Sequence, residues 1–246
     1  MAGYIDSAYN NKTEFIRNWL DKNLLPDAKS FRVQSGYFTY AAIEPFVQVL
    51  KSVATSGESV KFVLGSNGGS LIAKDAKGVL EIIKGSPNCS FTVVAFKNAE
   101  FHPKCYYIKS GDDSETVLVG SGNLTQFGIS LNVEAAILLD TSAGDNLALV
   151  QEIKNAIDKW GSLSENDGAY QIKTIQDIED LRQSKIIDLG NVEARIPRGK
   201  VLRQKKPKKS LKKSLKGHWP ISKTPGLKPP SPKSVATVLI AEIPNA

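Results

Sequence analysis

Up to residue 187, apolar and polar positions recur with the periods of helices and strands. Apolar side chains three and four residues apart predict amphipathic helices at residues 12–25, 41–56, 71–84, 147–160 and 175–187. Short runs rich in β-branched and aromatic residues predict strands at residues 31–40, 60–64, 90–96, 105–108, 116–119 and 133–139. Because helices and strands alternate early and strands then follow one another closely, we expect an α/β fold in which helices flank a mixed sheet.

The charge balance changes near the C-terminal end of this region. Residues 198–233 contain thirteen Lys or Arg and no Asp or Glu. Subtracting these and Glu242 from totals of 32 basic and 25 acidic residues leaves 19 basic and 24 acidic side chains in residues 1–197, a net charge of −5. The chain's net charge of +7 therefore comes from its C-terminal segment.

We expect three parts along the chain. Residues 1–195 form the α/β domain, and residues 196–234, rich in Lys, Pro and Ser, form a basic flexible linker. Residues 235–246 begin with an apolar run that predicts a strand without a partner, so we expect the start of a truncated second domain. The basic segment either contacts nucleic-acid phosphates, which makes binding salt-dependent, or serves as a spacer.

Membrane, secreted and zinc-binding classes are not favoured. The chain is 41% hydrophobic, which suffices for a packed core, but no apolar run approaches the roughly 18 residues of a membrane span. The N-terminus lacks the basic and then apolar pattern of a signal peptide. Cys89 and Cys105 lack metal-ligand spacing and are expected to be core thiols. We therefore expect a cytoplasmic protein with no membrane partner.

The candidate chemistry begins at His102 and Lys104. These residues are two positions apart in an extended segment, so their side chains point the same way. This arrangement places a nucleophile or base beside a fixed positive charge. The sequence thus predicts a reactive imidazole with a cationic neighbour.

A Gly-Ser-Gly-Asn turn follows the predicted strand at residues 116–119. The small residues Gly120, Ser121 and Gly122 let the backbone approach an anion, and Asn123 can donate hydrogen bonds to it. Glu134 opens the next predicted strand. Together these groups suit phosphate chemistry.

The order His-x-Lys, Gly-Ser-x-Asn, Asn-x-Glu resembles the active-site motif of the phospholipase D superfamily. The matching residues here are His102, Lys104, Gly120, Ser121, Asn123, Asn132 and Glu134. The resemblance implies that the domain has the phospholipase D-like mixed sheet flanked by helices. One position departs from the family pattern, because the aspartate usually found five residues after the lysine is Lys109 here.

The resemblance also implies a reaction and a role for each residue. His102 would attack phosphorus to form a phosphohistidine that water resolves, as in a DNA endonuclease. Lys104, Asn123 and Ser121 would bind phosphate oxygens, and Glu134 would hold the tautomer of the His102 ring. No acidic cluster suited to Mg²⁺ accompanies the motif, so we expect a metal-independent reaction with no cofactor.

The order of a nuclease domain, a linker and a second domain is similar to that of the NgoFVII-type restriction endonucleases. This resemblance implies that residues 235–246 begin a B3-like DNA-binding domain and that the partner is double-stranded DNA. Superfamily members with one motif copy are expected to share an active site between two subunits, so we expect a homodimer. The other histidine, His218, lacks a lysine partner. Whether an ATP-dependent, helicase-like partner licenses cleavage stays open.

The same residues admit other interpretations. A dinucleotide-binding loop at Gly120–Gly122 is disfavoured, because Thr125 replaces the third glycine and little room is left for a crossover helix. A lipid phosphodiesterase or phosphatidyltransferase, and a non-catalytic nucleic-acid-binding module, stay open. The cationic linker argues against the lipid enzyme, and the intact pair of His102 and Lys104 argues against the binding module.

Overall fold

The computed structural model describes residues 2–8, 15–25 and 27–188 of the 246-residue chain. The expected linker at 196–234, with His218, and the expected start of a second domain at 235–246 lie outside the described residues, as do residues 12–14 of the first expected helix. Within the described ranges, no helix is long and apolar enough to cross a membrane.

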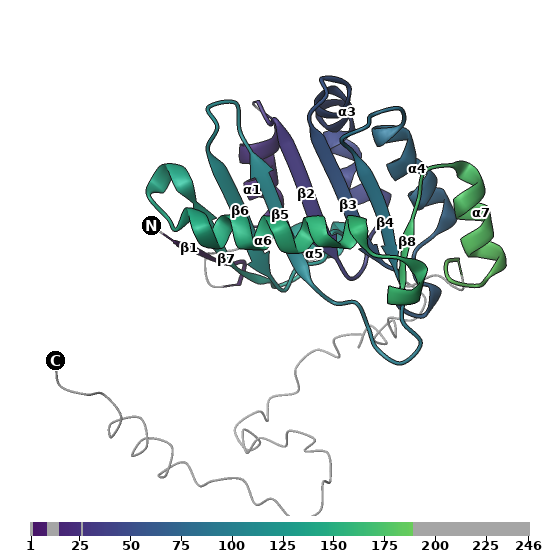
Figure 1. The fold of residues 1–246 in the computed structure, drawn as a ribbon. Coiled ribbons are helices and arrows are strands. Elements are labelled where there is room, and N and C mark those ends of the chain that lie inside the picture. Colours follow the sequence, from purple (N-terminus) through teal and green to yellow (C-terminus); the bar gives the residue numbers. More distant parts are fainter. Residues whose placement is uncertain (1, 9–14, 26, 189–246) are drawn as a thin grey trace, which may run out of the picture. The chain divides into compact units, whose positions relative to one another are not determined.

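An eight-stranded sheet forms the centre of the described domain. Its strand order is β1-β7-β6-β5-β2-β3-β4-β8 (Figure 1). The strands are β1 (Gly3–Asp6), β2 (Ser30–Ser35), β3 (Ser59–Gly65), β4 (Ser90–Val94), β5 (Lys104–Lys109), β6 (Glu115–Gly120), β7 (Ala135–Asp140) and β8 (Ala169–Gln171). Strands β2, β3 and β4 are parallel and all other pairs are antiparallel, which confirms the expected mixed sheet.

Helices cover both faces of this sheet. The α-helices are α1 (Ile16–Leu24), α2 (Tyr40–Ile43), α3 (Val47–Thr55), α4 (Ala73–Ile83), α5 (Gln126–Ser130), α6 (Leu147–Lys159) and α7 (Ile175–Gln183). Short 3₁₀ turns are η1 (Glu44–Phe46), η2 (Asn67–Gly69), η3 (Thr141–Ala143), η4 (Trp160–Ser162) and η5 (Glu165–Asp167). Figure 1 shows α6 lying across one face, with α1, α3 and α4 on the other. The fold is therefore the expected α/β arrangement.

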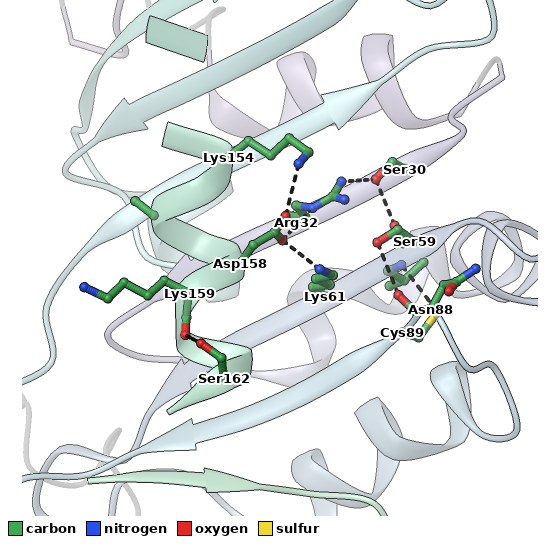
Figure 2. Close-up of polar contacts among 12 residues, drawn as sticks. Ser30, Arg32, Ser59, Lys61, Asn88, Cys89, Lys154, Asp158, Lys159 and Ser162 are labelled. Atoms are coloured by element: carbon green, nitrogen blue, oxygen red, sulfur yellow. Dashed lines mark hydrogen bonds and ion pairs between the residues drawn. The ribbon is translucent and has the colours of Figure 1, made fainter. Parts of the chain in front are cut away.

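The two faces of the sheet differ in polarity. Successive side chains of a strand point to opposite faces, so Phe31 and Val33 of β2 enter the large apolar core beneath α1, α3 and α4. Arg32, between them, faces α6 and pairs with Asp158 of that helix (Figure 2). Lys61 of β3, directly opposite Arg32, pairs with the same carboxylate. Ion pairs thus supplement a smaller apolar core in holding α6 to the sheet.

Several element boundaries differ from the sequence-based expectation. The strand expected at 31–40 ends at Ser35, because the chain turns and begins α2 at Tyr40. The helix expected at 41–56 is divided by η1, where Pro45 lacks the N–H that a continuous helix needs. The short elements β1, β8 and α5 were not predicted. Cys89 and Cys105 are free thiols, but both are only partly buried at the edges of the cores.

Candidate active site

His102 and Lys104 lie where β5 begins, beside the carboxyl end of β2. Lys104 is the first residue of β5 and faces Ser35 across the ladder. The Lys104 Nζ lies 2.7 Å from Nδ1 and 3.1 Å from Nε2 of the His102 ring, and it donates to the His102 carbonyl oxygen at 2.8 Å. The ring is exposed, whereas Lys104 is only 7% exposed. The structure therefore brings together the imidazole and ammonium groups predicted from their spacing.

Two opposing effects act on the pKa of the Lys104 ammonium group. Burial lowers the pKa of Lys104 below its ordinary value, while the charges of Glu134 and Glu100 raise it. Glu134, from the far side of the motif, therefore acts electrostatically on Lys104. Burial is the larger influence, so the pKa of Lys104 is lowered overall, and the nearby carboxylates offset part of that shift.

The glycine-rich turn after β6 is held by close contacts. The hydroxyl of Tyr106, a β5 residue of the large apolar core, donates to the Gly122 carbonyl oxygen at 2.8 Å. A Cβ on Gly122 would lie 2.3 Å from Ile16 Cδ1 and 2.8 Å from the Gly128 carbonyl oxygen, so only glycine fits there. The turn is thus packed against α1 and α5, and this packing fixes the position of the Asn123 backbone.

Asn123 is oriented by the segment that follows β2. Its Oδ1 accepts from the Tyr37 backbone N–H at 3.1 Å, and the next N–H, that of Leu124, donates to Ser35 Oγ at 2.8 Å. Because Oδ1 is the accepting end, the amide nitrogen of Asn123 is the end that can donate to a phosphate oxygen. The Tyr37 ring also meets the His102 ring edge-on, with centroids 5.8 Å apart. Tyr37 therefore connects the His-x-Lys part of the motif, at His102, to the Gly-Ser-x-Asn part, at Asn123.

Ser121, Asn132 and Glu134 form a separate hydrogen-bonded group. The Ser121 hydroxyl donates to Glu134 Oε2, and the Asn132 amide donates to Glu134 Oε1 at 3.2 Å. The Ala135 N–H donates to Ser121 Oγ at 3.0 Å. Within the described chain no hydrogen bond joins Glu134 to His102. The expected tautomer-holding role of Glu134 therefore has no contact inside one subunit and stays a prediction.

Sequence reasoning did not single out Ser35, Tyr37 or Asn67. Tyr37 contacts Asn123 and His102 directly, whereas Ser35 and Asn67 bond to the backbone of residues next to the motif. The importance of all three therefore depends on which loops the fold brings together. Asn67, between β3 and α4, bonds to Phe101, the residue before His102. Among the described residues, no group of three or more His, Cys, Asp and Glu side chains could hold a metal ion.

Comparisons with known proteins address the family. The family model described as "Cardiolipin synthase, PLD-like domain" matches residues 23–160. No curated protein matches the chain. The chain is similar to the solved structure of Nuc from Salmonella typhimurium, described as a phospholipase D family member, with 16% identity, coverage of 71% of this chain and 99% of that chain, and a TM-score of 0.48.

Two further solved structures are similar to this chain. NucT from Helicobacter pylori shares 18% identity over 65% of this chain and 94% of that chain, with a TM-score of 0.46. Yeast tyrosyl-DNA phosphodiesterase shares 12% identity over 56% of this chain and 31% of that chain, with a TM-score of 0.39. The family model spans more than half of the chain and includes every candidate residue from His102 to Glu134. This chain therefore belongs to the phospholipase D-like domain family, within a superfamily of phosphodiesterases.

Proposed function

We propose that this chain is the catalytic part of a metal-independent restriction endonuclease that hydrolyses DNA phosphodiester bonds. The observation that carries the proposal is the contact between the Lys104 ammonium and the ring nitrogens of the exposed His102. That pair combines a nucleophile with a fixed cation on a domain of the phospholipase D-like family. The restriction type rests on the sequence after residue 195, with its basic segment and the apolar run that would start a B3-like domain.

The proposed reaction has two displacements at phosphorus. First, a ring nitrogen of His102 forms a bond to phosphorus while the bond from phosphorus to the leaving nucleoside oxygen breaks. Water then attacks the phosphohistidine, and the phosphorus–nitrogen bond breaks to free His102. The water proton passes to a second histidine, which had given its own proton to the leaving oxygen in the first step.

Lys104 and Asn123 would stabilise the charge that develops on the non-bridging oxygens. The Lys104 ammonium is held beside His102, and the Asn123 amide is oriented by Tyr37. Preorganised donors of this kind contribute about 3 kcal/mol each to transition-state stabilisation. Ser121 would contribute to phosphate binding only after releasing Glu134, because its hydroxyl proton is donated to that carboxylate. Lys104 supplies positive charge at the place where a metal ion would otherwise act.

The second histidine would come from a second copy of the chain. In-line displacement puts the nucleophile and the leaving group on opposite sides of phosphorus, so one imidazole cannot serve both. His102 is the one histidine in the described part of the chain. A twofold homodimer would bring two copies of His102 to one shared site. Across that interface, Glu134 would orient the His102 ring of the other subunit. Within its own described chain, Glu134 makes no hydrogen bond to His102.

Exposed apolar side chains beside the motif support such an interface. Val133, the residue before Glu134, is 69% exposed, and Leu131 in the same loop is 61% exposed. Phe127 of α5 and Ile137 of β7 are also exposed. Apolar side chains clustered beside a functional site commonly mark a contact surface. Burial of this loop against a second copy would bring the two motifs close together.

The direct test is plasmid cleavage by the purified chain in excess EDTA. We expect the wild type to nick or cut the plasmid, and His102→Ala to abolish cleavage while DNA binding is largely retained. Quenching with an alkaline denaturant during turnover, which preserves a phosphorus–nitrogen bond, should trap a DNA fragment covalently on the protein in the wild type only. Cleavage that requires added magnesium would refute the metal-independent reaction, and full activity in His102→Ala would refute the nucleophile.

A mixed dimer tests the shared site. Wild-type and His102→Ala chains with different tags are co-expressed, and the dimer carrying both tags is isolated. A shared site needs both histidines, so this species should cleave far below half of the wild-type rate. Half the wild-type rate or more would mean that each subunit carries a complete site.

A lipid phosphodiesterase is the second candidate, and the exposed loop at Leu131 and Val133 is the observation that favours it. Apolar side chains beside a phosphate site would also suit a membrane surface. Hydrolysis or transfer on phospholipid vesicles, without plasmid cleavage, would select this alternative. Binding to DNA without turnover on either substrate would select the non-catalytic module.

A further inference from the structure

A buried asparagine binds the backbone next to His102. Asn67 follows β3 in η2 and is 8% exposed. Its Nδ2 donates to the carbonyl oxygens of Gly36 at 3.0 Å and Phe101 at 2.9 Å, and its Oδ1 accepts from the Phe101 N–H at 2.9 Å. Both amide protons and the amide oxygen are therefore satisfied by two backbone segments that are distant in sequence.

These contacts lie in a segment that makes no strand-to-strand hydrogen bonds of the β ladder. Residues 101–103 precede β5 and belong to no strand, yet His102 lies among them. The Gly36 N–H donates to the Pro103 carbonyl oxygen at 3.1 Å, on the other side of His102. A Cβ on Gly36 would lie 2.7 Å from the Phe101 oxygen, so the two segments touch directly. Asn67 and Gly36 together hold the backbone on both sides of His102.

The segment that contains Gly36 also contacts Asn123, in the Gly-Ser-x-Asn part of the motif. Gly36 is followed by Tyr37, whose N–H binds Asn123 and whose ring meets the His102 ring. By joining Gly36 to Phe101, Asn67 therefore influences the separation between His102 and Asn123. None of its own atoms is left to bind a substrate phosphate.

We propose that Asn67 is a positioning residue that holds His102 and Asn123 in the geometry needed for attack at phosphorus. The inference rests on the proposed role of His102 and adds a residue outside the motif to the site. Misplacement of a reacting group by about 1 Å can lower a rate about 100-fold. Removing the Asn67 amide should therefore lower kcat and leave KM almost unchanged, because substrate contacts are retained.

The experiment compares steady-state cleavage of a defined DNA duplex by the wild type, Asn67→Ala and a control. The control is Asn88→Ala, because Asn88 also donates to a backbone oxygen, that of Gly57, but lies in an exposed loop away from the motif. We expect Asn67→Ala to lower kcat about 10- to 100-fold with KM within about twofold, and Asn88→Ala to change neither. Thermal melts fix an assay temperature at which every variant is folded.

Asn67→Asp supplies a readout that a loss of stability alone would not give. An ionised carboxylate cannot donate to the Gly36 and Phe101 oxygens, whereas the protonated acid can donate to one of them. This variant is nearly isosteric and neutral at low pH, so it is the form best able to keep the fold. The measured quantity is the kcat of the variant divided by the kcat of the wild type at the same pH. This ratio should rise as the pH falls for Asn67→Asp and should not change with pH for Asn67→Ala.

The outcomes separate the inference from the proposed function. Variants of Asn67 that are folded and keep kcat within about threefold of the wild type would overturn the inference, as would a rise in KM with kcat unchanged. An Asn67→Asp ratio that does not change with pH would also count against it. A wild-type chain that cuts no DNA would refute the proposed function, and the inference would fail with it.

Discussion

Replacing Asp158 by asparagine should lower the free energy of unfolding of the described domain by about 2–3 kcal/mol. The Asp158 carboxylate accepts from Arg32 at 2.8 Å, Lys61 at 2.9 Å and Lys154 at 3.1 Å (Figure 2). The substitution keeps the size of the side chain but removes its charge. Three cations would then face one another around a neutral amide.

The magnitude follows from how deeply the group is buried. The four side chains are between 9% and 26% exposed, so the cluster is neither a surface pair nor a fully buried one. Exposed pairs contribute about 0.2–1 kcal/mol, and removing one partner of a buried pair costs about 3–5 kcal/mol. An intermediate value of about 2–3 kcal/mol corresponds to a fall in Tm of about 4–12 °C for a domain of this size.

The loss should also change how stability depends on pH. Burial raises the pKa of Asp158, but hydrogen bonds from Lys61 and the charge of Arg32 outweigh it, so the folded pKa lies below the ordinary value. A carboxyl group of this kind contributes its stability above its unfolded pKa of about 3.9 and loses it as the pH falls through the folded pKa. The difference between wild type and Asp158→Asn should therefore be constant at neutral pH and shrink below about pH 4.

Urea unfolding at pH 7 and pH 3.5, followed by circular dichroism, measures both effects. The matched control is Asp21→Asn, because Asp21 pairs with Arg17 at the same 2.8 Å but its side chain is 39% exposed. That control should change stability by less than about 1 kcal/mol. Equal losses for the two variants, or a loss at Asp158 below about 1 kcal/mol, would refute the argument from burial.

Three further predictions concern the site and its surroundings. Lys104→Ala should lower kcat by about 10²- to 10³-fold and also weaken DNA binding, unlike His102→Ala; equal affinities in a filter-binding assay would contradict this. Deleting residues 197–246 should weaken nonspecific DNA binding and flatten its salt dependence, because residues 1–197 carry a net charge of −5; an unchanged slope would make the segment a spacer. Val133→Asp should weaken the dimer and its cleavage activity in sedimentation and plasmid assays, whereas Leu25→Asp, also at an exposed apolar site, should not; a stable, active Val133→Asp dimer would exclude this loop from the interface.

The long periodic segments were predicted well because their patterns extend over several turns. The helices expected at 71–84 and 147–160 appear as α4 and α6 with small changes at their ends. Shorter elements could not be found this way. The strand β8 has three residues and, within the described part of the chain, pairs with β4 alone, so it forms because the fold brings it to that edge. Local patterns predict an element only where its own residues decide its conformation.

The proximity of His102 and Lys104 was predicted for a similar reason. His102 and Lys104 are two residues apart, so the conformation of one short segment decides whether they meet, and their nitrogens do lie within hydrogen-bond distance. The contact expected between Glu134 and His102 spans a longer stretch of chain. Within one described subunit, Glu134 bonds to Ser121 and Asn132, which lie closer to it in the motif, and its contact with His102 stays a prediction. The spacing of the motif did not predict these two bonds.

The groups that position the motif could not be predicted from any local pattern. Asn67 is 34 residues from Phe101, and Tyr37 is 86 residues from Asn123. Asn67 meets Phe101 because β5 lies beside β2 and β2 lies beside β3, so the loop after β3 reaches the segment before β5. Tyr37 meets Asn123 because β2 and β6 both run antiparallel to β5 and therefore end at the same edge of the sheet. That strand order depends on the packing of the whole domain. The motif therefore predicts which groups can react, whereas the order of the strands determines which backbone amides and carbonyls hold them in place.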